Sequence, residues 1–511
     1  MLDTPAMREA RPRRWWAFAC LCLPVLVTSM DVSVLLFAVP SLTRDLHAGA
    51  SQQLWILDVY GLVLAALLLP FGAVADRIGR RRLLLLGAGL FGLASLGAAW
   101  APSASALILA RAVLGIGGAT LMPSALSLVR SLFDDPSERS KAVGIWSAVL
   151  AGGVGLGPVV SGLLVEHFWW GSVFLVNVPA VALLLVAVPA LVPESRAEHP
   201  ARLDLRSAAL CLAAVLSLVY TVQTVAESGW GPGRVATLAL GLLAGTLFVR
   251  RQRTSPNPML DLGWFRERLF TGSVTVNAIG MAVIVGNGFL ISQYLQSVLG
   301  MSPLRAALWS VAPTVVVGGI APLAPVIMAR AGRARTVAGA LTVAAAGFVV
   351  LTRAQPQSTV WFALTGATLV AAGVVAVATL VTDVVVSAVP AHRTGAAAGF
   401  VETTTELAGA LGIAVLGSVL AAVYRSHLAL PALPTGARHA AGESLAGALA
   451  VAQGGGRGTT SLIDAARTAY AAGMHTADVA AAGLLLAGAV LALITLRRSH
   501  QATEALPADS A

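Results

Sequence analysis

The sequence has few charged residues and almost no lysine. Only 11% of its 511 residues are charged, whereas ordinary soluble domains carry roughly 25%. The single lysine, Lys141, stands in SERSKAVG with no glycine-rich loop before it, so the phosphate-binding pattern GxxxxGKS/T is absent. This absence excludes an ATP-hydrolysing pump of the P-loop kind and argues against a lysine Schiff base.

Cysteine and histidine patterns that would bind a metal are also missing. Cys20, Cys22 and Cys211 all lie inside apolar segments, without metal-site spacing or an extracellular partner. None of the eight histidines forms a close HxxxH-type pair. We therefore expect no metal site, and we find no scaffold for an enzyme active site.

Apolar residues are abundant, at 57% of the chain, and they occur in long runs. About 20 apolar residues cross a bilayer as a helix, and lipid offers no partner to an unpaired backbone group. The sequence therefore predicts an all-α membrane protein. We place fourteen spans at residues 15–40, 53–75, 83–101, 105–129, 142–165, 172–192, 207–226, 235–249, 269–298, 307–329, 336–352, 360–389, 397–424 and 476–496.

The placement of the basic residues predicts the orientation. With a cytoplasmic amino terminus, 25 of the 34 lysines and arginines fall on the inner side, eight fall outside, and Arg111 lies within a span. This split follows the positive-inside rule, puts both termini in the cytoplasm and accounts for the net charge of +10 without a nucleic-acid partner. A cleaved signal peptide is the disfavoured alternative, because the first apolar run continues past residue 38 and includes Asp31.

Two stretches, beginning at Ser51 and Ser302, share a layout of a proline-containing span followed by a basic turn. Duplicated halves are typical of secondary transporters. We predict a six-helix bundle at 1–192, two extra and peripheral spans with cytoplasmic flanks at 193–268, a second six-helix bundle at 269–499 and a tail at 500–511. The outer stretch 425–475 is either a cap over the outer mouth or a passive connector, and the connector is favoured.

Several carboxyl groups lie inside apolar spans, where each is costly unless it is neutralised or hydrated. They are Asp31, Asp58, Asp383, Glu402 and Glu406. Desolvation raises the pKa of a carboxyl group and a nearby cation lowers it, so cation binding can release a proton. Alternatively, Asp31 and Asp58 lie near enough to the outer boundary to be hydrated, and Arg393 neutralises Asp383.

Aromatic residues within or near the spans could contact flat cations through their rings. Candidates are Trp55, Tyr60, Trp146, Phe289 and Tyr294. Interfacial anchoring or packing is the favoured explanation for most of them.

Three strings resemble motifs of the major facilitator superfamily. GAVADRIGRRR resembles the loop that latches the two halves in that family, which implies a latch role for Gly72, Asp76, Arg77, Gly79 and Arg80. LILARAVLGIGGA carries Arg111 where the family ties an arginine to proton coupling. GVGLGPVVSG, with Gly153, Gly157, Pro158 and Gly162, resembles the motif that separates exporters from importers. A plain basic loop, a structural Arg111 and close packing of small residues are the alternatives.

MDVSVLLFAVP and SQQLWILDVYGLVLAALLLP further resemble the fourteen-helix drug:proton antiporter subfamily, the QacA type. The resemblance implies two six-helix bundles with two additional central helices, in a monomeric protein of the cell membrane. It also implies proton-driven export of lipophilic cations such as dyes, quaternary ammonium compounds and antibiotics, without a cofactor. Substrate or proton handling would involve Asp31, Asp58, Glu402 and Glu406.

The tenth span lacks the acid that some relatives with divalent substrates carry, which favours monovalent cations. A dedicated exporter of one metabolite or self-made antibiotic is the alternative in the same fold. A membrane sensor or enzyme is a weaker alternative of another class, because the paired acids and the exporter-like string favour transport.

Overall fold

The computed structural model describes residues 5–133, 135–196, 204–255, 258, 262–320, 323–387, 394–428, 435–453 and 459–496. Within these ranges the regular structure is helical, and no strand occurs. This agrees with the expectation from the solvent, because a helix satisfies its backbone hydrogen bonds within a single segment.

The first half of the molecule consists of α1 to α7. These helices are α1 (Pro5–Leu46), α2 (Ala50–Ile78), α3 (Arg80–Ala99), α4 (Ala104–Leu132), α5 (Pro136–His167), α6 (Ser172–Leu175) and α7 (Asn177–Leu191). Side chains at the helix starts supply the missing backbone partners. Ser103 accepts a hydrogen bond from the backbone N–H of Ala106 at 3.2 Å, and Asp135 caps α5 in the same way.

A central hairpin and the second half follow. The hairpin is α8 (Leu205–Ser228) with α9 (Pro232–Thr254), and the short η1 (Leu262–Arg266) comes after it. The second half comprises α10 (Arg268–Gln293), the π-turn η2 (Tyr294–Val298), α11 (Pro303–Ile320), α12 (Leu323–Ala331), α13 (Arg333–Leu351), α14 (Val360–Ser387), α15 (Thr394–His427), α16 (Thr435–Glu443), α17 (Leu445–Gln453) and α18 (Thr459–Thr495).

Thirteen helices of the described chain are long and apolar enough to cross a membrane. The remaining predicted span, 307–329, falls on α11 and α12, and residues 321–322 between them lie outside the described residues. The last helix differs from the prediction, because α18 begins at Thr459 and not near 476. The predicted start rested on hydropathy alone, which is low in the polar first turns of this helix.

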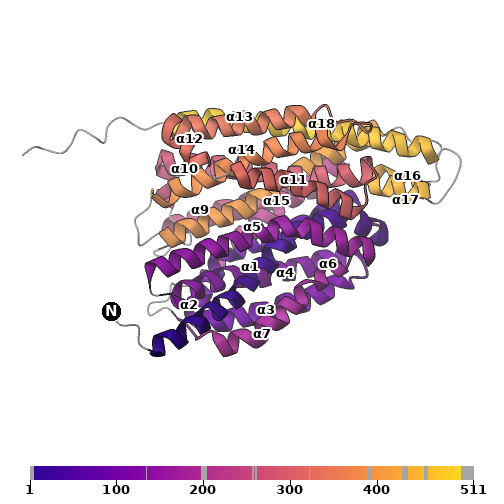
Figure 1. Cartoon of the computed structure of the whole chain (residues 1–511). Coiled ribbons are helices and arrows are strands. Elements are labelled where there is room, and N and C mark those ends of the chain that lie inside the picture. The colour runs from indigo at the N-terminus through magenta and orange to yellow at the C-terminus, as the bar shows by residue number, and fades with distance from the viewer. Residues whose placement is uncertain are drawn as a thin grey trace, which may run out of the picture.

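The two halves repeat one packing pattern. In the first half α1 packs on α4, α5 and α7, α3 packs on α4 and α7, and α2 packs on α4. In the second half α10 packs on α14, α15 and α18, α13 packs on α14 and α18, and α11 packs on α14. Each pair in one half therefore has a counterpart in the other. Figure 1 shows the two groups of helices one above the other, with the indigo and magenta first half below.

Two helix pairs make the most extensive contact between the halves, α2 with α15 and α5 with α11, and we call these two contacts the seams. The hairpin lies against the first of these seams, because α8 contacts both α2 and α15. Leu62, Val219, Ala410 and Ala414 form an apolar cluster from these three helices. The hairpin thus lies outside the two bundles, and α8 contacts both halves across this seam.

The base of the hairpin is held by Asp204, just before α8. Its carboxylate accepts hydrogen bonds from Arg251 Nε at 2.9 Å and from Ser207 Oγ at 2.5 Å. Burial alone would raise the pKa of Asp204, but the hydrogen bonds from Arg251 and Ser207 outweigh it, and the net pKa is lowered. These hydrogen bonds thus connect the start of α8 to the end of α9.

The stretch 425–475 contains α16 and α17, at the end of the bundle that the basic residues predict to be outer (Figure 1). We call this the outer end. α17 contacts α1 of the first half as well as α18 and η2 of the second. The Tyr424 hydroxyl donates to the carbonyl of Ala441 at 2.9 Å and ties α15 to α16. The described part of the stretch therefore contacts both halves at the outer end, and the choice between a cap and a connector stays a prediction.

Candidate functional site

A buried ion pair lies in the interior of the first half. Asp31 on α1 is 0% exposed and Arg111 on α4 is 1% exposed, and the two side chains form a salt bridge. Arg111 Nε also donates to the carbonyl of Ile56 at 3.1 Å, and its guanidinium lies 4.6 Å from the ring centroid of Tyr60. Charges are tolerated at this depth because each has a partner.

The ion pair continues into a polar network. The second carboxylate oxygen of Asp31 accepts from Asn177 Nδ2 at 3.3 Å, and the same nitrogen lies 3.4 Å from Ser95 Oγ. The network thus joins α1, α3, α4 and α7. Sequence reasoning singled out Asp31 and Arg111 separately but not Asn177. The available signal was one polar residue in the otherwise apolar string FLVNVP.

A second buried acid, Asp58 on α2, faces the central hairpin. It is 1% exposed, and its Oδ2 accepts a hydrogen bond from Gln223 Nε2 of α8 at 2.8 Å. Gln223 is itself buried, at 2% exposed. An uncharged residue attracts little attention in a sequence, so Gln223 was not among the predicted site residues. The boundary-hydration alternative for Asp31 and Asp58 does not hold in this conformation, because both are buried.

Glu402 and Glu406 lie on α15, one helical turn apart, and both are half-buried. Between them, Thr405 Oγ1 accepts from Asn277 Nδ2 of α10 at 3.0 Å. α15 packs on α2, which carries Tyr60 beside Arg111. The acid pair and the Asp31–Arg111 pair thus lie on helices that meet at or next to this seam.

Two further acids complete the set. Asp383 belongs to α14, but its side chain lies outside the described residues. Asp478 on α18 is 0% exposed, and neither of its oxygens has a hydrogen-bond partner within the described structure. The sequence prediction overlooked Asp478 because the predicted span began only two residues before it.

The turn between α2 and α3 holds the basic string. Gly79 has φ +111°, a conformation that favours glycine, and Asp76 pairs with Arg80 at 2.9 Å. Arg80 Nη1 donates to Ser195 Oγ at 3.3 Å, after α7 in the same half. Gly72 has open space around it. These contacts tie the turn to α7, and the latch role of Gly72, Asp76, Arg77, Gly79 and Arg80 stays a prediction.

The exporter-like string lies on α5, where it packs against α1. A side chain at Gly153 or Gly157 would run into Ser29 or Ser33, respectively. At Gly162 it would lie 2.7 Å from the Cα of Leu304 in the second half. Pro158 stands inside α5 between these contacts. Close helix approach is thus the physical role of these three glycines, as the packing alternative expected.

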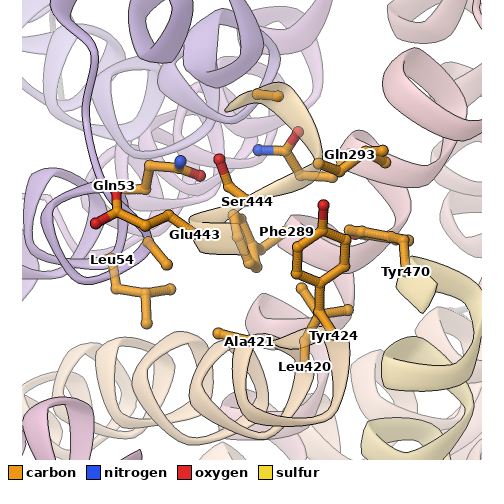
Figure 2. Close-up of a pocket in the computed structure, with 14 residues that line it drawn as sticks. Gln53, Leu54, Phe289, Gln293, Leu420, Ala421, Tyr424, Glu443, Ser444 and Tyr470 are labelled. Atoms are coloured by element: carbon orange, nitrogen blue, oxygen red, sulfur yellow. The ribbon is translucent and has the colours of Figure 1, made fainter. Parts of the chain in front are cut away.

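A small cavity of about 40 Å³ lies between the halves at the outer end. Figure 2 shows Gln53 and Leu54 of α2 on the left, Gln293 of α10 on the right, Phe289 between them, and Tyr424 reaching up from α15 below. Glu443 ends α16, and Ser444 lies between α16 and α17. The lining combines one carboxyl group with amides and aromatic rings, and in this conformation the space is of water size and smaller than a drug-sized ligand needs.

The five predicted aromatic residues are dispersed. Phe289 lines the outer cavity, and Tyr60 lies against Arg111. Trp55 packs on Tyr220 of α8 with ring centroids 6.3 Å apart, Trp146 of α5 is half-buried, and Tyr294 is buried with its hydroxyl donating to the carbonyl of Gln355 at 2.6 Å. The structure does not gather them around one cavity.

Two repeated helical halves, with buried charges near the seams between them, define the class of secondary membrane transporters. Residues 21–413 match the model of the Major Facilitator Superfamily. The chain belongs to this superfamily.

Similar proteins agree with this assignment. The multidrug efflux pump LfrA of Mycolicibacterium smegmatis is 44% identical over 97% of this chain and 99% of its own length. The methyl viologen resistance protein SmvA of Salmonella typhimurium is 36% identical over 82% of this chain and 85% of its own. A bacterial homologue of the lysosomal transporter Spinster, solved inward-facing and unoccupied, superposes with a TM-score of 0.68 at 17% identity, covering 95% and 97% of the two chains. This last likeness concerns the fold alone.

Proposed function

We propose that the chain is a proton-coupled multidrug efflux antiporter of the cell membrane that exports lipophilic, mainly monovalent cations. The observation that carries the proposal is the set of acids within the spans, of which Asp31 and Asp58 are buried and Glu402 and Glu406 are half-buried. The names of LfrA and SmvA support export of toxic compounds, because they describe multidrug efflux and methyl viologen resistance.

The chemistry follows from competition at a carboxyl group. An acid in an apolar environment holds a proton, and an organic cation beside it favours the ionised form. Binding of the cation therefore releases the proton, and reprotonation expels the cation. If the two steps occur with the cavity open to opposite sides, the proton gradient drives export without a cofactor.

The substrate range follows from the sparse polar lining. Apolar contact and aromatic rings tolerate varied shapes, whereas few directional hydrogen bonds select one. Monovalent substrates are favoured because α11 and α12 carry no acidic residue. In this proposal the partners are small lipophilic cations, protons and membrane lipids, and the functional unit is a monomer.

Proton release from liposomes tests the proposal. The purified protein is reconstituted with an acidic lumen, and ethidium or tetraphenylphosphonium is added outside while a trapped dye reports the lumenal pH. We expect the cation to dissipate the gradient, and Glu402→Gln to slow this exchange. A gradient that is indifferent to every lipophilic cation tested, with well-folded protein, would overturn the multidrug proposal and favour a dedicated substrate.

A further inference from the structure

The contact between Asp58 and Gln223 joins the central hairpin to the first half. Gln223 Nε2 donates to Asp58 Oδ2 at 2.8 Å, and both side chains are almost completely buried. The remaining oxygen of each side chain, Asp58 Oδ1 and Gln223 Oε1, is also buried and has no hydrogen-bond partner within the described structure. The two side chains that share this hydrogen bond thus each carry one buried oxygen without a partner within the described structure.

One proton would satisfy both oxygens. An ionised carboxylate and an amide oxygen are both acceptors, so they cannot bond to each other, whereas a protonated carboxyl group has one O–H donor. With the proton on Oδ1, Asp58 donates to Gln223 Oε1 while Gln223 Nε2 donates to Oδ2. The result is a cyclic acid–amide pair with two hydrogen bonds and no buried orphan.

We propose that Gln223 is a positioning residue that holds Asp58 in its protonated form and senses the loss of that proton. Ionised Asp58 presents two acceptors to one amide, so Oδ1 and Oε1 repel and one hydrogen bond is lost. The proposal deepens the function proposed above and rests on it for its transport consequence. In this proposal the hairpin of α8 and α9, which belongs to neither of the two repeated halves, takes part in proton coupling.

The position of α8 extends this effect to the seam. Val219 of α8, one turn from Gln223, packs with Leu62 of α2 and Ala410 of α15. Release of Gln223 from Asp58 therefore loosens a helix that contacts both halves at once. The protonation state of Asp58 is thereby linked to the α2–α15 seam, which has to rearrange when access alternates.

Other ionisable groups surround α2 in the membrane interior. They are Asp31 on α1, Tyr60 on α2 itself, Arg111 on α4, Cys211 and Tyr220 on α8, and Glu402 and Glu406 on α15. The arginines that open α3 lie at its inner end. The hydrogen bonds described for Asp58 come from Gln223 alone, so the acid–amide pair is its local environment.

Infrared difference spectroscopy tests the pair directly, since a protonated carboxyl group has a carbonyl stretch distinct from that of a carboxylate. Purified protein at neutral pH should show a protonated-acid band that Asp58→Asn removes. Gln223→Leu should shift this band to higher frequency, because the carbonyl loses its amide donor. The matched control is Thr221→Val, which breaks the 2.9 Å Thr221–Thr237 contact inside the hairpin and should leave the band in place.

Transport provides the second readout. Gln223→Leu should slow ethidium-driven proton release on the order of tenfold, the ratio expected for one lost hydrogen bond, and displace its pH profile, whereas Thr221→Val should change neither. No protonated Asp58 band in the wild type, or a band unmoved by Gln223→Leu, would overturn the inference. If no cation exchanges with protons but the band behaves as expected, the antiport function fails and the acid–amide pair stands.

Discussion

At the scale of the residue, burial decides which side chains need partners. Asp31 and Arg111 lie where a lone charge is strongly unfavourable, and each is compensated by the other and by neutral groups such as Asn177 and the carbonyl of Ile56. The pair holds α1 and α4 together while placing two charges beside Tyr60. Removing one partner leaves the other charge buried and uncompensated.

A double-mutant cycle on this pair gives the first residue-scale prediction. Asp31→Asn and Arg111→Met should each destabilise the protein in detergent by about 3–5 kcal/mol, because each leaves an unpaired polar or charged group. The double variant should be less destabilised than the sum of the two, since no lone charge remains. Thermal unfolding of the three variants measures this, and strictly additive effects would mean that the two residues do not act as a pair.

The same scale shows what the sequence could predict about the site. Ionisable residues in apolar spans are conspicuous, so the sequence predicts site roles for Asp31, Asp58 and Arg111. Their partners Asn177 and Gln223 are neutral, and a neutral polar residue in a long span has many structural explanations. Pairing itself depends on helices distant in the chain, and no pattern along a single segment encodes it.

At the scale of the element, the glycines on one side of α5 allow this helix to pack closely on α1. Gly153 points at Ser29, whereas nothing lies within 4 Å of the neighbouring Gly152. The sequence GVGLGPVVSG suggested close packing but not the partner helix, since small residues at four-residue spacing fit any neighbour. The structure assigns α1 as the partner of Gly153 and Gly157, and α11 as the partner of Gly162.

These adjacent glycines provide a matched pair of variants. Gly153→Leu should lower the free energy of unfolding by about 1–3 kcal/mol, because the new side chain overfills the α1–α5 interface. Gly152→Leu should cause no loss, because its side chain enters open space and leucine favours a helix over glycine. Chemical or thermal unfolding in detergent compares the two, and equal losses would contradict the assigned interface.

Element boundaries were less predictable than element identity. Hydropathy located the spans well, because a bilayer demands about 20 apolar residues of each. It could not show that α18 begins at Thr459, because a helix can extend beyond the membrane with a mixed polar surface. It also could not place α8 at a seam, because a lipid-facing helix and a seam helix are both apolar.

At the scale of the whole molecule, this conformation is closed at the outer end. Glu166 of α5 accepts hydrogen bonds from Ser302 Oγ at 3.0 Å and from the backbone N–H of Leu304 at 3.2 Å, both in the second half. Gly162, one turn earlier on α5, allows the same close approach. The α5–α11 pair is therefore a contact that has to open for outward release.

Weakening this contact should shift the population toward outward opening. Glu166→Ala removes the one carboxylate oxygen that accepts both hydrogen bonds, so a cysteine introduced at position 304 should react faster with a membrane-impermeant maleimide added outside. Glu166→Gln retains a side-chain oxygen and should have a smaller effect. Equal labelling rates in the parent, Glu166→Ala and Glu166→Gln would show that these hydrogen bonds do not stabilise the closed outer end.

The hairpin also breaks the equivalence of the two seams with respect to lipid. α8 covers the seam between α2 and α15, whereas α5 and α11 present apolar side chains outward, among them Val154 at 49% exposed and Val315 at 68%. Lipid therefore reaches the α5–α11 seam directly, whereas α8 shields the α2–α15 seam from it. The two additional helices thus make the two seams of a duplicated architecture unequal in their exposure to lipid.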